Sequence, residues 1–174
     1  MVHLVKKRHQ SLQPLSRDHG VSLLCALHGQ KAVRAPLHDR LRLTKQIKVL
    51  GQVAVLSYLH DEQRVLSSLI EDDVLRSEFQ QHHNGIRELI YQLDLVESSV
   101  DPGIGLLASI AAVLESYVRW EENSLFPLLE QTLGYEVLSK LKESTDSIES
   151  SRARPTQLLH RSISLEVSSG LPLQ

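Results

Sequence analysis

The amino-acid sequence predicts an all-α protein folded as an up-down four-helix bundle. Apolar residues recur at three- and four-residue spacing through most of the chain's 174 residues, as on the inward face of packed helices. No segment shows the sustained alternation of apolar and polar residues that is typical of a half-buried strand. Short links separate the periodic stretches, which favours helices that run antiparallel to their neighbours.

The first half of the chain holds two predicted helices. One is predicted over residues 16–33, where Ser16 can cap the free amide groups and Pro36 follows the end. The other is predicted over residues 37–70, long for a globular protein, and Gly51 weakens it without breaking it. Its expected buried stripe consists of Leu50, Val53, Val55, Leu59, Val65, Leu66 and Leu69.

The second half holds two more long helices. Glu71, Asp72 and Asp73 offer caps for a third helix that runs to Ser98. The composition of residues 99–103 predicts a turn. A fourth helix is then predicted over residues 104–132, and Gly134 marks its end.

The end of the chain differs in composition from the rest. A short helix is predicted over residues 136–142, and from Ser144 onward serine becomes frequent while the apolar pieces become short. We therefore predict one domain, a bundle over residues 8–143, followed by a Ser-rich tail over residues 144–174 that docks locally at most.

Composition limits the partners and the compartment. Lys+Arg 19 against Asp+Glu 21 give a formal net charge of −2 with the signs interspersed, which favours neither nucleic acid nor an anionic membrane as a partner. The single cysteine, Cys25, cannot form an internal disulfide, and no apolar run reaches the roughly 18 residues that a membrane span needs. The basic N-terminal stretch lacks the apolar core of a signal peptide. We expect a cytoplasmic protein.

Two carboxylates fall on stripes that should face the core. Glu62 lies among the apolar positions 55, 59, 66 and 69, and Glu121 lies among 114, 118, 125 and 128. A tyrosine stands four residues before each of them, Tyr58 and Tyr117. Glu122 lies close enough to the same seam to compete with Glu121.

Two histidines complete the pattern on the other two helices. His19 falls in line with Leu15, Leu23, Ala26 and Leu27. His83, or its neighbour His82, is set among Phe79, Ile86, Leu89 and Ile90. The helices therefore alternate between a histidine and a tyrosine–glutamate pair, which is a two-fold pseudo-symmetry.

A metal ion would explain these inward polar residues. Burying two carboxylates costs several kcal/mol each unless cations or hydrogen-bond donors compensate, and no Lys or Arg shares the inward stripes near them. Carboxylates and imidazoles from facing helices are how bundle cores hold di-iron or di-manganese centres. Phenolate oxygens from Tyr58 and Tyr117 would suit ferric iron.

The simpler reading is a hydrogen-bonded core. A single inward histidine is more often a satisfied core residue, and a buried tyrosine is usually a large side chain with a bonded hydroxyl. Cys25 is expected in the core as well. The remaining histidines without a partner pattern are expected at the surface: His3, His28, His38, His60 and His160.

Three segments resemble the hemerythrin-like domains, the hemerythrin HHE cation-binding family. They are RHQSLQPLSRDH at 8–19, EFQQHHNGIRELIYQL at 78–93 and YVRWEENSLFPLLE at 117–130. The resemblance implies metal ligands at His19, Glu62, His83 and either Glu121 or Glu122. It also implies one or two non-heme iron ions, usually a bridged pair, that bind or sense oxygen, nitric oxide or iron.

The chain departs from the family at two ligand positions. Tyr58 and Tyr117 stand where the family has histidines, and Phe79 stands where a further histidine would coordinate. Because phenolates favour the ferric state, we expect a role in sensing, storage or stress response rather than reversible oxygen transport. Manganese or zinc are the other metals that such a site could bind, and a homodimer is a possible assembly. The alternative is a metal-free bundle with a structural or interaction role. Nothing in the sequence indicates the substrate channel that an oxidase needs.

Overall fold

The computed structural model describes residues 8–152, and every regular element within them is helical, as predicted. The helices are α1 (Gln13–Arg34), α2 (Leu37–Leu50), α3 (Leu56–Leu66), α4 (Asp73–Leu95), α5 (Ile104–Trp120), α6 (Phe126–Thr132) and α7 (Tyr135–Ser151). Two π-helical turns, η1 (Gly51–Val55) and η2 (Glu121–Leu125), join α2 to α3 and α5 to α6 in continuous rods. Gly51, expected to weaken its helix, opens η1.

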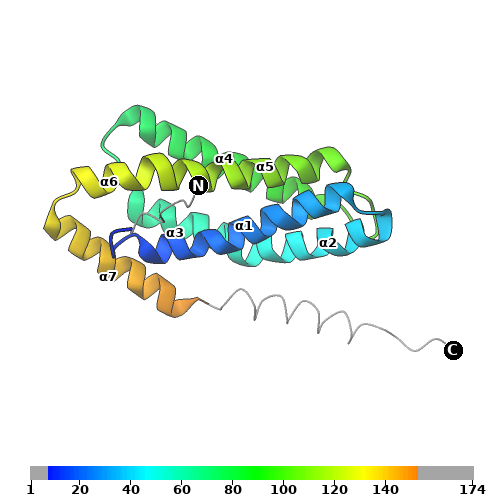
Figure 1. Ribbon diagram of the computed structural model, residues 1–174, viewed down its shortest axis with the longest axis horizontal. Helices are drawn as coiled ribbons and strands as arrows, with labels where there is room; N and C mark the ends of the chain where they lie inside the picture. The colour runs from blue at the N-terminus through cyan, green and yellow to red at the C-terminus, as the bar shows by residue number, and fades with distance from the viewer. Residues whose placement is uncertain (1–7, 153–174) are drawn as a thin grey trace, which may run out of the picture.

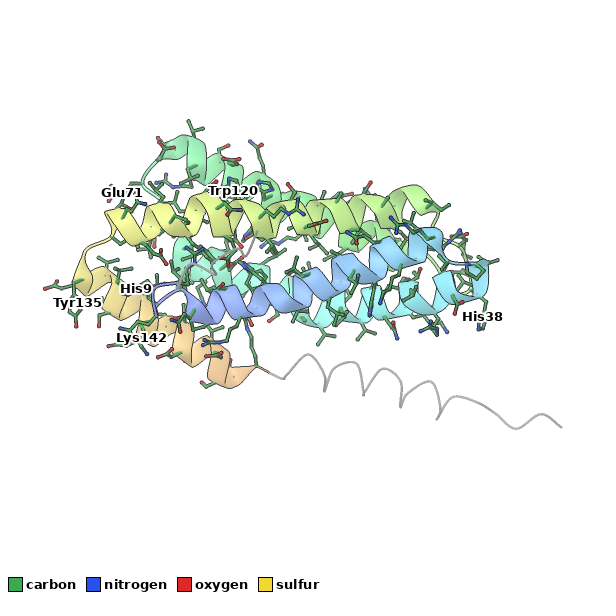
Figure 2. All side chains as sticks on the ribbon, viewed as in Figure 1. His9, His38, Glu71, Trp120, Tyr135 and Lys142 are labelled. Atoms are coloured by element: carbon green, nitrogen blue, oxygen red, sulfur yellow. The ribbon has the colours of Figure 1, made fainter. Side chains whose placement is uncertain are left out.

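The long helices lie side by side along the longest axis of the molecule (Figure 1). α1 packs most extensively against α5 and α2, and α4 packs against α5. His38 near the start of α2 and Tyr135 at the start of α7 mark opposite ends of this axis (Figure 2). α7 lies obliquely at one end, where it contacts α1 and α3.

The backbones of α1 and α5 approach each other closely at Gly29. A Cβ added to this glycine would lie 3.0 Å from both the Cβ of Ala111 and the carbonyl oxygen of Leu107. Only a residue without a side chain allows this separation. The contact holds α1, which carries His19, tightly against α5, which carries Tyr117.

Capping residues set several helix boundaries. Asp72 caps α4 by accepting a hydrogen bond of 2.8 Å from the backbone N–H of Leu75. Gly103 precedes α5 with a φ of +84°, a conformation that glycine adopts freely. In contrast, Ser16 is not the cap of α1, because Pro14 starts that helix earlier, in the first turn, where its missing N–H costs nothing.

The last helix is longer than the sequence predicts. The sequence predicts a helix over residues 136–142, but α7 continues to Ser151, so residues 144–151 are helical and do not belong to an irregular tail. The reason is a buried stripe at helical spacing that the many serines obscure: Leu138, Leu141, Thr145 and Ile148. Residues 153–174 of the predicted tail lie outside the described residues.

Four residues predicted to face the core are exposed instead. Leu23 and Leu27 are each 42% exposed, Val53 is 52% exposed, and Leu128 on α6 is 39% exposed. On α1 the core-facing positions are 15, 19, 22, 26 and 29, so both leucines point about 100° away from that stripe. Val53 lies inside η1, whose wider turn changes the direction of its side chains.

Two further expectations concern Cys25 and membranes. Cys25 is fully buried, and burial raises the pKa of its thiol to about 12, so it is an inert core residue. Within residues 8–152, no helix is both long and apolar enough to cross a bilayer.

Arg152 ties the end of α7 to the rest of the molecule. Its guanidinium pairs with Asp18 of α1 and, at 2.8 Å, with Asp61 of α3. Burial lowers the pKa of Arg152 to about 10, which still leaves the side chain charged at neutral pH. Asp18 immediately precedes His19 and Asp61 immediately precedes Glu62, so the end of α7 is anchored beside these two buried polar residues.

Candidate metal centre

Six of the polar side chains predicted to face the core meet in one buried group, the polar cluster. Its members are His19, Tyr58, Glu62, His83, Tyr117 and Glu121, none more than 3% exposed. They come from α1, α3, α4, α5 and η2. The walls are aromatic: Phe126 stacks on His19 with ring centroids 5.5 Å apart, and Phe79 packs on His83 at 4.1 Å.

Glu121 accepts most of the hydrogen bonds in the polar cluster. Its Oε2 lies 2.9 Å from His19 Nε2 and accepts a bond of 2.9 Å from the Tyr58 hydroxyl. Its Oε1 lies 2.8 Å from the Tyr117 hydroxyl. Because three donors surround this one carboxylate, it is the member that the surroundings best accommodate as an anion.

Tyr117 is the centre of the other half of the polar cluster. Its hydroxyl oxygen lies 2.6 Å from Glu62 Oε2, 2.8 Å from Glu121 Oε1 and 2.7 Å from His83 Nε2. A phenol has a single proton, so it donates one of these bonds and accepts the other two. The protonation of the neighbours decides which.

The pKa shifts indicate where the protons lie. Burial, and then the charge of Glu121, raise the pKa of Glu62 well above its ordinary value. Burial lowers the pKa of His83 to about 3. Burial and Glu121 also raise the pKa of both tyrosines. Glu62 as a neutral acid and His83 as a neutral imidazole then both donate to the oxygen of Tyr117, which donates to Glu121.

In the half of the polar cluster around Tyr117, two buried atoms have no hydrogen-bond partner among the described residues, Glu62 Oε1 and His83 Nδ1. When the neutral imidazole of His83 donates through Nε2, its Nδ1 carries no proton and is only an acceptor. Leaving it unpaired therefore costs the desolvation of one acceptor and not of a donor as well. Glu62 Oε1 is a carboxyl oxygen that remains free to take a ligand.

His19 links the polar cluster to an outer group of charges. Its Nδ1 lies 2.8 Å from Glu122 Oε1 and forms an ion pair with it, although the angle between the two groups does not meet that of a hydrogen bond. Burial opposes a charge on His19, but the contacts with Glu121 and Glu122 outweigh it and raise the pKa to about 9. Glu122 also accepts bonds of 2.5 Å from Ser16 and from Arg8. Although burial alone would raise the pKa of Glu122, these contacts lower it to about 2.

The π-helical turn η2 lets two consecutive acids reach the same imidazole. Neighbouring residues of an α-helix point about 100° apart, whereas the wider π turn brings their directions closer together. Pro127 explains why the turn forms here: it has no N–H, and its ring would press on the carbonyl of Asn123 in a regular α-helix. The wider turn relieves that clash.

The structure shows which residue of each adjacent pair is buried in the core. His83 belongs to the polar cluster, whereas His82 is only half-buried and packs against Trp120 with centroids 4.8 Å apart. Glu121 belongs to it as well, whereas Glu122 lies outside, on the far side of His19.

Sequence reasoning missed two members of the outer group, Arg8 and Ser16. Arg8 is 9% exposed and pairs with Glu130 as well as Glu122. The sequence suggests Ser16 as a helix cap, but its position three residues before His19 on the same helix is the signal that places it on the inward face.

The other histidines lie mostly where the sequence predicts. His38 and His60 are exposed, and His3 and His160 lie outside the described residues. His28 is the exception: it is half-buried, and burial and the charges of Lys31 and Arg42 lower its pKa. The charged neighbours of His28 are Lys31 and Arg42, neither of which belongs to the polar cluster.

The polar cluster fits a metal ion. The donor atoms of His19, Glu62 and Glu121 all lie within 4.8 Å of one another. Two ligands bound to one ion at about 2.1 Å lie up to about 4.2 Å apart, so small side-chain movements would bring the three into bonding distance. Imidazole and carboxylate donors beside a phenol suit iron. Glu62 Oε1 could bind without giving up a hydrogen bond.

The surface grooves lie elsewhere. One of about 710 Å³ runs between α3 and α7 beside Arg64 and Lys140, and another of about 430 Å³ lies beside His38 and Arg42. Neither is lined by a residue of the polar cluster.

No protein-family model, curated protein or solved structure matches this chain. The function therefore has to be inferred from the polar cluster itself.

Proposed function

We propose that the chain is a hemerythrin-like up-down four-helix bundle that binds iron in its polar cluster. Its four members would be α1, the α2–α3 rod, α4 and the α5–α6 rod, which lie along one axis (Figure 1). The observation that carries the proposal is the buried trio His19, Glu62 and Glu121, with donor atoms within 4.8 Å of one another.

The surroundings of the trio support this proposal. Within residues 8–152, Glu62 and Glu121 contact histidine and tyrosine side chains, and neither is paired with a lysine or arginine. Burial, and then the nearby charge of Glu121, raise the pKa of Glu62, so two ionised carboxylates at this position would need a further positive charge. A cation would supply that charge.

The donor set favours ferric iron. His19, Glu62 and Glu121 would hold the ion, and the hydroxyl of Tyr58, which already contacts Glu121 at 2.9 Å, would be the next donor. A bound iron ion would supply a one-electron redox couple and a coordination position for oxygen or nitric oxide. Sensing of iron or of these gases, or storage, fits such a site better than reversible oxygen transport.

The test is iron loading of the full chain. The protein is mixed with ferrous iron in air, desalted and analysed for metal content and visible absorption. We expect bound iron and a purple or blue phenolate-to-ferric band. Both should be lost when Glu62→Ala and Glu121→Ala are combined, and both should persist in the control Glu88→Ala, which alters an exposed residue of α4. Full iron content in the double variant would refute the site.

A second function, a metal-free structural bundle, is supported by one specific observation. Each tyrosine hydroxyl contacts the glutamate of the opposite segment, Tyr58 with Glu121 at 2.9 Å and Tyr117 with Glu62 at 2.6 Å. These crossed contacts, together with the His19–Glu121 pair, compensate much of the buried polarity without an ion.

Thermal unfolding separates the two functions. A metal that binds only the folded state must raise the melting temperature, so iron should stabilise the protein and chelator should reverse the effect. A melting temperature indifferent to both, in a protein without bound metal after loading, would establish the metal-free bundle instead.

A further inference from the structure

The hydroxyl of Tyr117 occupies a position toward which three other side chains converge. Glu62, Glu121 and His83 each place one donor or acceptor atom between 2.6 and 2.8 Å from its oxygen. These residues come from α3, η2 and α4, so the oxygen is surrounded from three separate segments. The oxygen holds these three side chains together.

The ring of Tyr117 is fixed as firmly as its hydroxyl. The side chain is fully buried. It packs edge-on against His83 with ring centroids 5.4 Å apart, and against Trp120 at 6.2 Å. An ion coordinated by Glu62, Glu121 and His83 would have to take the position of this hydroxyl oxygen, and the closely packed ring holds the hydroxyl in that position.

The opposite side of the polar cluster is different. There, Glu121 Oε2 faces His19 Nε2 and the hydroxyl of Tyr58, both at 2.9 Å. Glu62 places a carboxyl oxygen within 4.8 Å of the donor atoms of His19 and Glu121, and one of its two oxygens has no hydrogen-bond partner among the described residues. His19 and Tyr58 each direct a hydrogen at Glu121, and a bound cation would take the place of these two hydrogens. Accordingly, the donor group that could share one ion includes His19 and not His83.

We infer that the polar cluster takes a single hard cation per chain, on the side of His19 and Tyr58, and that the hydroxyl of Tyr117 excludes a second ion. This inference rests on the proposed iron binding and specifies its ligand class and stoichiometry. His83 is then a hydrogen-bond donor to Tyr117 and not a metal ligand.

The decisive measurement is iron per folded chain in the wild type and in Tyr117→His, with the double variant Glu62→Ala and Glu121→Ala as the background for adventitious iron. We expect one ion in the wild type and two in Tyr117→His, because imidazole is shorter than phenol and supplies a donor. Tyr58→Phe is the matched control: it removes a hydroxyl from the other side and should not raise the count above one.

A second pair of variants tests His83 directly. His83→Gln should leave the wild-type count at one but lower the count of Tyr117→His from two to one. If Tyr117→His is unstable, Tyr117→Phe replaces it, since it removes only the oxygen and should also open the second position.

The outcomes are distinguishable. Two ions in the wild type, or one ion in every Tyr117 variant, would overturn the inference while leaving iron binding intact. Loss of the wild-type iron in His83→Gln would overturn it as well. No bound iron in any folded variant would overturn the proposed function and the inference together.

Discussion

Glu121 Oε2 and His19 Nε2 lie 2.9 Å apart, and both side chains are almost completely buried. The pair joins α1 to η2 and holds opposite charges, since the pKa of His19 is raised to about 9 although burial alone would lower it. The same carboxylate accepts hydrogen bonds from both tyrosines of the polar cluster. Much of the polar cluster therefore depends on one side chain.

Glu121→Gln should be strongly destabilising. The amide cannot compensate the charge of His19, and breaking a buried ion pair by removing one partner costs about 3–5 kcal/mol. Chemical denaturation of the metal-free protein measures this loss. Glu122→Gln is the control: its side chain is 27% exposed, so water can replace part of what is lost and the effect should be less than half as large. Equal losses would contradict the central role of Glu121.

The stability of the metal-free protein should fall as pH rises from about 6.5 to about 9. The pKa of His19 is 6.5 in the unfolded chain and about 9 in the folded protein. Its stabilising contribution is therefore complete below pH 6.5 and is lost as pH approaches 9, with a slope of at most about 1.4 kcal/mol per pH unit.

The variant His19→Gln isolates this effect. Unfolding free energies are measured against pH, with chelator present, for the wild type and the variant. The slope of the variant between pH 6.5 and 9 should be shallower, with any remaining slope arising from the raised pKa of Glu62. Parallel curves would show that His19 is not charged in the folded state.

Gly29→Ala should lower the free energy of unfolding by about 1–3 kcal/mol, because the new methyl group would meet the α5 backbone and Ala111 at 3.0 Å. Gly20→Ala, on the same helix, is the matched control. Nothing lies within 4 Å of its added Cβ, so it should stabilise the protein by about 0.5–1 kcal/mol. Denaturant titration of both variants is sufficient, and the same sign for both would contradict the close approach of α1 and α5.

Arg152→Met should loosen the end of α7. Arg152 is 18% exposed and pairs with two aspartates, and loss of such charged hydrogen bonds costs about 1.5–3 kcal/mol. Amide hydrogen exchange at residues 148–151 should become faster. Arg17→Met removes a pair whose side chains are 54% and 42% exposed and should cost less than about 1 kcal/mol. Unchanged exchange in Arg152→Met would show that the Arg152 ion pairs do not hold the end of α7 in place.

The helices could be predicted from spacing and from local chemistry. Asp72 and Gly103 mark their boundaries in the sequence because a cap and a turn act within a few residues. The exposure of Leu23 could not be predicted, because which of two adjacent apolar stripes on α1 faces inward depends on the partner helix. The helical spacing of Thr145 and Ile148 is obscured by the serine-rich composition around them, so the sequence alone does not predict that they are buried.

The members of the polar cluster could be predicted because each breaks an apolar stripe. The contacts between individual atoms could not be predicted from the sequence. Whether Glu121 or Glu122 faces the core depends on the π-helical turn, whereas an argument from residue spacing assumes a regular α-helix. The contribution of Arg8 lies in a contact between residues more than a hundred positions apart, which only the folded chain defines.

The π-helical turn η2 also restricts how this segment can change in length. The wider π turn accommodates one residue more than an α turn while the helices on either side keep their direction, so inserting one further residue within 121–125 would rotate everything beyond it by about 100°. Phe126 and Leu129, now buried, would leave the core, and the ring that stacks on His19 would be lost. Insertions are therefore expected to be tolerated in the link at residues 96–103 and selected against in η2.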